Sequence, residues 1–215
     1  MSSVPPARDA AGKAIAPRSD SRARDTRDRI LDAAVTTLAE EGYARATTLR
    51  IQDVAGVSRG RLLHHFPSRD ELLVAAVSHL ATRRIHDLPA ATDPPEDPVA
   101  RIDAAVTTMW STYRQPYFWA AFELWLAARS NDALAAALGP AERAVQSEIR
   151  ASTAALFGPR LAAHPEFDGL VRFLNTSMRG AATSYAFLRD RDPDRELLLP
   201  TWRAYARDTL LPPEA

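Results

Sequence analysis

The residues with the clearest chemical potential in this 215-residue chain lie together at Gly56–Arg61. Arg59 and Arg61 carry planar guanidinium groups that can donate paired hydrogen bonds to phosphate or to guanine. Ser58 is of a type that caps helices, and Gly60 would let a helix start approach a partner closely. This combination is suited to binding a polyanion.

The string Gly56-Val57-Ser58-Arg59-Gly60 also matches the G-x-S-x-G motif of serine hydrolases. That chemistry needs a strand before the serine, a sheet beneath it, and an acid and a histidine further along the chain. An apolar stretch with helical character precedes Ser58, so a capping serine is predicted instead. His64 and His65 would point about 100° apart on a helix, and the chain has no cysteine. We therefore expect no catalytic site, metal or cofactor.

Two short helices joined by a tight turn must position these residues. The first runs from Leu49 to Ala55, with Thr47 and Thr48 as candidate caps, and Gly56-Val57 form the turn. The second runs from Arg59 to about His65 and stops before Pro67. A longer helix, from about Arg24 to Glu41 and closed by Gly42, precedes them. This is the pattern of a helix-turn-helix, whose second helix enters the major groove of DNA.

Several short strings over residues 24–75 have a consistent order and spacing. They are Thr26–Ala34, Glu41-Gly42-Tyr43, Thr47-Thr48-Leu49, Ala55–Gly60, Leu62, His65–Arg69 and Leu72-Leu73. In these strings the chain resembles the TetR family of transcriptional regulators. Its second helix is about one residue shorter than usual between Thr48 and Ile51. Leu63 stands where the family often has a phosphate-contacting tyrosine, so that contact is lost or passes to His64 or His65.

The resemblance implies a homodimer that presents two recognition helices to a palindromic operator and releases it when a small molecule binds. Its DNA-contacting residues would be Arg24, Arg27, Thr47, Thr48, Ser58, Arg59, Gly60, Arg61, His64, His65 and Arg69. Thr47 and Thr48 could also serve only as caps. Arg24 and Arg27, together with Arg22, could form an arm that reaches DNA or could belong to a basic tail.

The rest of the chain also has helical periodicity, so the predicted fold is all-α. It comprises a three-helix DNA-binding head and a C-terminal helical bundle for ligand binding and dimerisation. Ser68–Glu71 form a capping box that opens a helix to about Asp87, and a proline-rich loop covers 89–98. Further helices are expected at 99–114, 116–129, 132–157 (kinked at Pro140) and 166–189, with a last one reaching Leu211.

The expected organisation is a disordered tail (1–22), the helix-turn-helix domain (23–68), a connecting helix (69–87) and the ligand-binding and dimerisation domain (89–215). The resemblance places the dimer interface on the last two helices. A suitable apolar stripe there is Phe167, Leu170, Val171, Leu174, Met178, Tyr185 and Leu188, although an intramolecular core would give the same stripe.

Aromatic residues are concentrated between Trp110 and Trp125, which hold three of the four tryptophans. Part of this cluster must be core, but large aromatics also line small-molecule pockets. The predicted pocket residues are Trp110, Tyr113, Phe118, Phe122, Glu123 and Trp125. Glu123 would be either a partly buried carboxylate that pairs with an arginine or with a ligand, or an outward charge.

Charge is distributed unevenly although the formal net charge is zero. Residues 1–66 hold 11 basic and 8 acidic side chains, and residues 67–215 hold 16 and 19. A basic head on a slightly acidic body is compatible with DNA binding. No run of eighteen apolar residues or secretory leader is recognisable, so a cytoplasmic protein without membrane contact is expected. A ligand-responsive repressor is the leading interpretation; an activator, an architectural DNA-binding protein and a helical-bundle enzyme are the alternatives.

Overall fold

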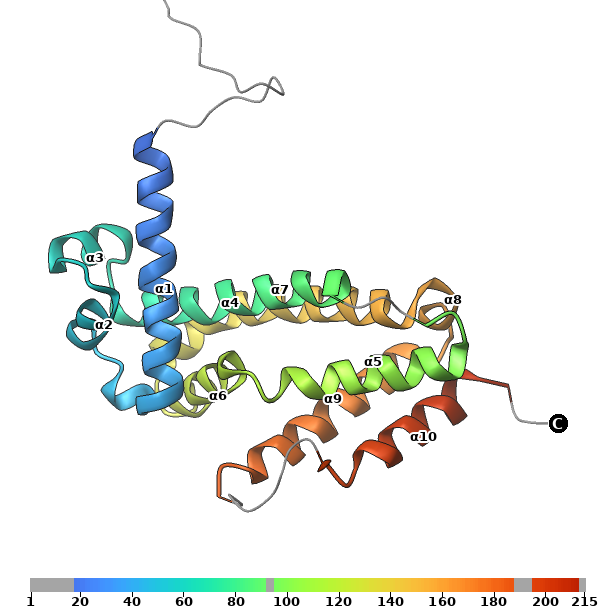
Figure 1. The fold of residues 1–215 in the computed structure, drawn as a ribbon. Coiled ribbons are helices and arrows are strands. Elements are labelled where there is room, and N and C mark those ends of the chain that lie inside the picture. Colours follow the sequence, from blue (N-terminus) through green and yellow to red (C-terminus); the bar gives the residue numbers. More distant parts are fainter. Residues whose placement is uncertain (1–17, 92–94, 188–194, 213–215) are drawn as a thin grey trace, which may run out of the picture.

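The computed structural model describes residues 18–91, 95–187 and 195–212, and its regular elements there are α-helices (Figure 1). They are α1 (Arg18–Arg45), α2 (Thr48–Ala55), α3 (Arg59–His65), α4 (Arg69–Ala91), α5 (Pro98–Thr112), α6 (Pro116–Ala128), α7 (Asp132–Phe157), α8 (Pro159–Ala162), α9 (Phe167–Ser184) and α10 (Leu199–Leu210). The all-α prediction is confirmed. None of the described helices is both long and apolar enough to cross a membrane.

Local capping explains the boundaries of the short helices. The Thr47 hydroxyl accepts a hydrogen bond from the Arg50 amide (3.1 Å) and caps α2. The Ser58 hydroxyl does the same for the Arg61 amide (3.3 Å) and caps α3. Such side chains satisfy amides that have no partner within the helix. Ser58 of the G-x-S-x-G string is therefore a helix cap, as predicted.

Two predicted boundaries differ from the structure, and one short helix was not predicted. α1 begins at Arg18, so 18–22 are helical, whereas 1–17 lie outside the described residues. α4 continues to Ala91 and so includes Pro89, which removes only one hydrogen bond near the helix end. The short helix α8, begun by Pro159, was not predicted.

Two hydrophobic cores hold the helices together. The first core joins α1–α4 to α6 and the start of α7, and includes Ile30, Leu38, Ile51, Leu62, Leu72, Leu73, Leu124, Leu134 and Leu138. The second core joins α5, α9 and α10 to the end of α7, and includes Ile102, Trp110, Phe157, Leu174, Met178 and Trp202. Trp125 of α6 packs against both cores. The first core therefore extends well past residue 68, where the sequence suggested that the head ends.

The apolar stripe predicted for the dimer interface belongs mostly to the second core. Phe167, Leu170 and Val171 are buried within the chain, as are Leu174 and Met178, and Tyr185 packs against this core. Leu188 lies outside the described residues. Of the two possibilities for this stripe, the structure thus shows the intramolecular core, because α9 packs against α10 within one chain, which sequence periodicity cannot distinguish from packing against a second chain.

Candidate DNA-binding surface and ligand cavity

The helix α3 presents a polar face to solvent because its other face is fixed in the first core. Leu62 is buried there, whereas Arg59, Gly60, Arg61 and His64 are exposed. The α2–α3 pair stands on one side of α1, away from α5–α10 (Figure 1). The sequence-predicted groups thus lie together on an accessible surface, with Leu63, 42% exposed, beside them.

Arg29 of α1 fixes the turn before α3, a role that sequence reasoning missed. Its Nη2 donates to the carbonyl oxygens of Ala55 (2.6 Å) and Gly56 (3.3 Å). Gly56 has a φ of 62°, in the left-handed region that glycine adopts without steric cost. A guanidinium placed at a helix C-terminus satisfies carbonyls that would otherwise lack partners. No neighbouring residue in the sequence indicates this contact, because the two carbonyl partners of Arg29 are 26 and 27 residues away along the chain.

The other predicted DNA contacts differ in their exposure. Arg24, Arg27, Thr47 and Ser58 are exposed, and Thr48 is half-buried. The Arg27 guanidinium carbon lies 5.4 Å from the Phe66 ring centroid. On α3, His65 is half-buried beside Phe66, and burial, followed by the nearby positive groups, lowers the pKa of its imidazole. A neutral imidazole is a weaker phosphate partner than a charged one, so the exposed His64 is the better placed of the two histidines.

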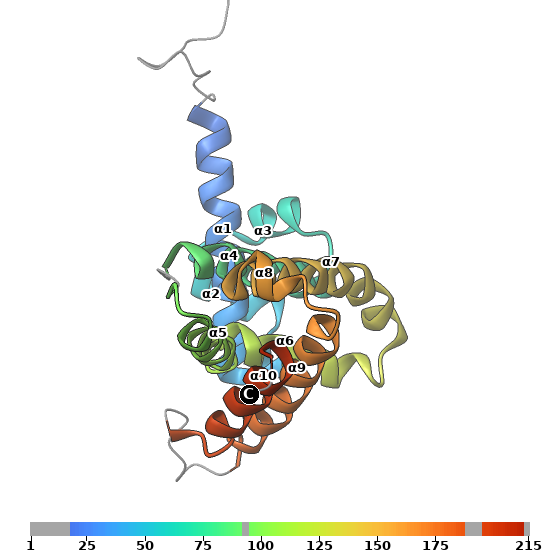
Figure 2. The same cartoon turned by 90° about the vertical axis from the view of Figure 1, so that its right-hand side faces the viewer.

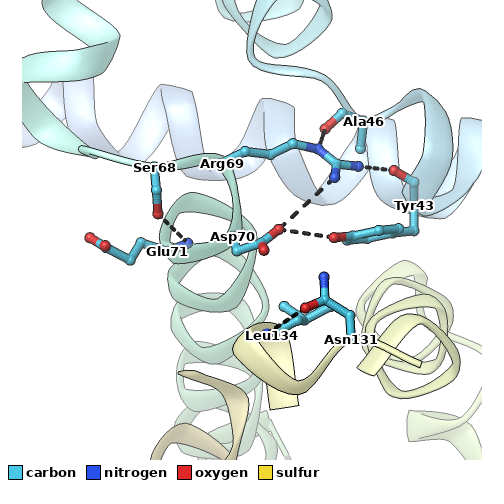
Figure 3. A network of polar contacts seen from close by, with 8 residues as sticks. All are labelled: Tyr43, Ala46, Ser68, Arg69, Asp70, Glu71, Asn131 and Leu134. Carbon is cyan, nitrogen blue, oxygen red and sulfur yellow. Dashed lines mark hydrogen bonds and ion pairs between the residues drawn. The ribbon is translucent and has the colours of Figure 1, made fainter. Parts of the chain in front are cut away.

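Arg69 is half-buried, unlike the exposed residues of α3, and its guanidinium holds α4 against the end of α1 (Figure 3). Its Nε donates to the carbonyl of Ala46 (2.8 Å), and Nη2 donates to the carbonyl of Tyr43. The guanidinium also lies 4.1 Å from the Tyr43 ring centroid. The Tyr43 hydroxyl donates to Asp70 (2.9 Å), and burial together with this bond raises the pKa of that hydroxyl. Arg69 is therefore a structural link between α4 and α1, and its predicted contact with DNA stays a prediction.

Glu123 of α6 provides a second link to the same place. Its Oε2 accepts a hydrogen bond from the Tyr43 amide (2.9 Å). Gly42, with φ 78° and ψ 170°, breaks the helical path of α1 and brings that amide toward the carboxylate. The prediction that Glu123 lines the ligand pocket is wrong, because its side chain points from α6 toward α1. Its partner is a backbone group, which residue types alone do not reveal.

A cavity of about 100 Å³ lies between α4, α5, α6, α7 and α9. It is lined by Val77, Ala81, Met109, Thr112, Tyr113, Tyr117, Phe118, Ala121, Trp125, Glu142, Val145, Gln146, Ile149, Ser152, Thr153, Leu156, Asn175 and Arg179. Three predicted residues, Tyr113, Phe118 and Trp125, line it. Trp110 instead packs against Trp202 in the second core, and Phe122 is not in the lining.

The helix α6 lies between this cavity and the head. Phe118, Ala121 and Trp125 face the cavity. Glu123 lies two residues from both Ala121 and Trp125, about 200° around the helix, and therefore contacts α1 instead. The cavity also touches α4 through Val77 and Ala81. Both helices that meet the head therefore form part of the cavity wall. Within the described part of the chain, no group of three acidic, histidine or cysteine side chains is placed to hold a metal ion.

Comparison with known proteins agrees with this arrangement. Residues 30–76 match the family described as bacterial regulatory proteins, tetR family. An uncharacterized HTH-type transcriptional regulator of Mycobacterium tuberculosis is 29% identical over 175 residues, which are 78% of this chain and 86% of that protein. The HTH-type transcriptional regulator BetI of Brucella anthropi is 34% identical over 85 residues, which are 40% of this chain and 44% of that protein.

Solved structures share the fold over nearly the whole chain. A transcriptional regulator from Rhodococcus sp. Rha1 has a TM-score of 0.68 at 20% identity, covering 86% of this chain and 99% of that one. The multidrug binding protein EbrR, complexed with ethidium, has a TM-score of 0.63 at 22% identity, covering 87% and 99%. The helix-turn-helix and its relatives define a DNA-binding transcriptional regulator. Residues 30–76 therefore form a DNA-binding domain of the TetR family.

Proposed function

We propose that this protein is a repressor that binds a palindromic operator as a homodimer in the bacterial cytoplasm and releases it when a small molecule enters the cavity. The observation that carries the DNA-binding part is the exposed pair Arg59 and Arg61 at the capped start of α3, backed by the buried Leu62. Arg24, Arg27, Thr47, Thr48, Gly60 and His64 would add backbone contacts around it. The complex of the fold neighbour EbrR with ethidium supports a ligand-binding role for the body.

The link between cavity and head supports control by the ligand. A ligand would touch α6 and α4 directly, and both helices hold the Gly42–Ala46 segment through Glu123 and Arg69. A displacement of either helix would therefore shift α1 and, through Arg29, the turn before α3. An effector can act in this way only to the extent that it binds the arrangement that releases DNA more tightly than the arrangement that binds DNA.

Selection of DNA from a random pool with the purified full chain tests this function. The expected result is an inverted repeat whose half-sites are centred one helical turn, or a multiple of it, apart. Affinity for that site should fall linearly with salt on logarithmic axes, because phosphate neutralisation releases counterions. Recovery of no consensus, with equal binding to all sequences, would favour an architectural protein. A repressor and an activator would differ in where the site lies relative to the promoter.

Dimerisation is proposed through the outer face of α9 and α10, at the end of the molecule opposite α3 (Figures 1 and 2). Phe173 and Tyr205 lie there with their ring centroids 4.7 Å apart, and each remains 47% exposed. Such an aromatic pair on a surface is typical of a protein interface. A two-fold interface built on this patch would bring two copies of α9 and α10 together.

Replacing Phe173 by glutamate is expected to shift the protein from dimer to monomer in analytical ultracentrifugation. The change places a charge within an apolar contact that two-fold symmetry repeats twice. Leu126→Glu is the matched control, because Leu126 is 51% exposed but lies on α6. Dissociation by Leu126→Glu together with an unchanged dimer in Phe173→Glu would place the interface elsewhere.

A further inference from the structure

Arg179 of α9 is a cationic side chain in the wall of an otherwise mainly apolar cavity. Its guanidinium carbon lies 4.7 Å from the ring centroid of Trp125, in a cation–π arrangement. Its Nε is buried and has no hydrogen-bond acceptor among the described residues. A buried guanidinium nitrogen without an acceptor is costly. The stacking on Trp125 leaves the edge of the guanidinium plane, where its N–H groups point, as the place where an acceptor would bind.

A second donor lies one helical turn before Arg179. The hydroxyl of Tyr113 donates to Asn175, with distances of 2.8 Å to Oδ1 and 3.1 Å to the backbone oxygen. Burial raises the pKa of this hydroxyl, and the nearby Arg179 charge lowers it to a smaller extent, so the phenol keeps its proton. Because Oδ1 of Asn175 is occupied, its amide nitrogen is the group left to bond a ligand. Residues i and i+4 share a helix face, so α9 offers two neighbouring donor groups to the cavity.

The rest of the cavity wall determines which kind of ligand could bind to these two donor groups. Met109, Phe118, Ala121, Val145, Ile149 and Leu156 supply an apolar surface, and Tyr113, Tyr117 and Trp125 add aromatic rings. The cavity of about 100 Å³ compares with the roughly 150 Å³ engineered cavity that holds benzene in another protein. A single ring or a compact apolar group therefore suits the space.

We infer that the effector is a small carboxylate with an aromatic or compact apolar body, whose oxygens accept hydrogen bonds from Arg179 and Asn175. This inference deepens the proposed function and rests on it, because the ligand is an effector only if its binding controls DNA release. Charged hydrogen bonds to a guanidinium are stronger than neutral ones and can be bidentate with a carboxylate. An anion in this position would neutralise the Arg179 charge.

Glu142 of α7 is the cavity residue that would suit a cation instead. It is partly exposed, so water can solvate its carboxylate, whereas the Nε of Arg179 is closed off from solvent. The two side chains do not form an ion pair with each other in the described structure. Because the unmet hydrogen-bonding need lies on the cationic residue, the cavity favours an anion.

The test measures binding by calorimetry and by thermal shift with the purified full chain in the absence of DNA. The probes are benzoate and phenylacetate, each beside its neutral primary amide, with benzylammonium as the cation. We expect at least one carboxylate to bind, and to bind about 10- to 100-fold more tightly than its amide, the difference typical of a charged hydrogen bond. Benzylammonium should bind no more tightly than the amides.

Variants assign the preference to Arg179. Arg179→Gln is expected to remove the preference for the carboxylate while leaving affinity for the amide within a few-fold of wild type. Arg179→Lys, which keeps the charge but not the paired donors, should recover part of it. Arg143→Gln is the matched control, because Arg143 is exposed on α7 and does not line the cavity; it should bind like wild type. The thermal midpoint of each variant without ligand reports whether it folds.

Three results would overturn the inference. They are no binding by any carboxylate, equal affinity for carboxylate and amide, and preferential binding of benzylammonium that is lost in Glu142→Gln. A separate measurement tests the proposed function, namely release of the selected DNA by the bound carboxylate. Tight carboxylate binding without DNA release would leave the ligand class standing and contradict ligand control.

Discussion

A variant with both Arg59 and Arg61 replaced by alanine is expected to lose sequence-specific DNA binding while it keeps its fold. Both side chains are exposed on α3, so their removal leaves the first core intact. Each base contact of this kind contributes about 1–3 kcal/mol of discrimination. Each single variant should therefore bind the selected site about fivefold to more than a hundredfold more weakly, and the double variant more weakly still. Gel-shift titration against the selected site and a scrambled site measures both effects.

The control for this prediction is an exposed arginine far from α3. Arg143→Ala removes the same charge from α7, in the body of the protein, and should leave affinity and base preference unchanged. If the Arg59 and Arg61 variants instead weakened binding to both DNA sequences equally, these residues would contact only the backbone. Unchanged binding in the double variant would mean that α3 is not the recognition helix.

Gly42→Ala is expected to destabilise the protein by about 2–5 kcal/mol. With φ 78° and ψ 170°, Gly42 occupies a backbone region essentially limited to glycine, where another residue costs about 1–3 kcal/mol. An added Cβ would also lie 3.2 Å from Oε2 of Glu123. This crowding would push the carboxylate away from the Tyr43 amide, at a further cost of about 1–2 kcal/mol. Chemical denaturation at neutral pH measures the loss.

Gly169→Ala is the matched control for this loss of stability. Gly169 is helical, and a Cβ there would meet nothing within 4 Å; the variant should be unchanged or up to about 1 kcal/mol more stable. Glu123→Gln keeps an oxygen that can accept from the Tyr43 amide and should cost less than Gly42→Ala. A Gly42→Ala protein with the same denaturation midpoint as wild type would show that the bend and its carboxylate contribute nothing to stability.

The head was predictable because short-range chemistry sets its boundaries. Thr47 and Ser58 cap helices from within the helix-turn-helix, Gly42 breaks the helical path of α1, and Gly56 ends α2. Each of these signals acts within four residues, so it can be read from one sequence. The role of Arg29 could not be predicted, since its carbonyl partners are 26 and 27 residues away along the chain.

The cavity was predictable only in part, because tertiary packing decides which way each side chain points. The aromatic cluster correctly indicated α6, yet neighbouring positions on it have different roles. Phe118 and Trp125 face the cavity, whereas Glu123 faces α1. Arg179 and Asn175 escaped notice because they are ordinary polar residues on a helix with an apolar stripe. Their importance comes from their position in the cavity wall opposite α6. Because α6 lies some fifty residues earlier in the chain, the sequence does not reveal this proximity.

The shared first core has a consequence for exchanging parts between related regulators. A hybrid joined after residue 68, or anywhere in α4, would separate Ile30, Leu38 and Leu72 from the side chains of α6 and α7 that complete their packing. Leu124, Leu134 and Leu138 would then face a foreign surface. A transplanted recognition unit must therefore carry α6 and the first turns of α7 with it, or be redesigned along that seam. The proposed base contacts are confined to a few residues of α3, but the structure that supports them extends across half the chain.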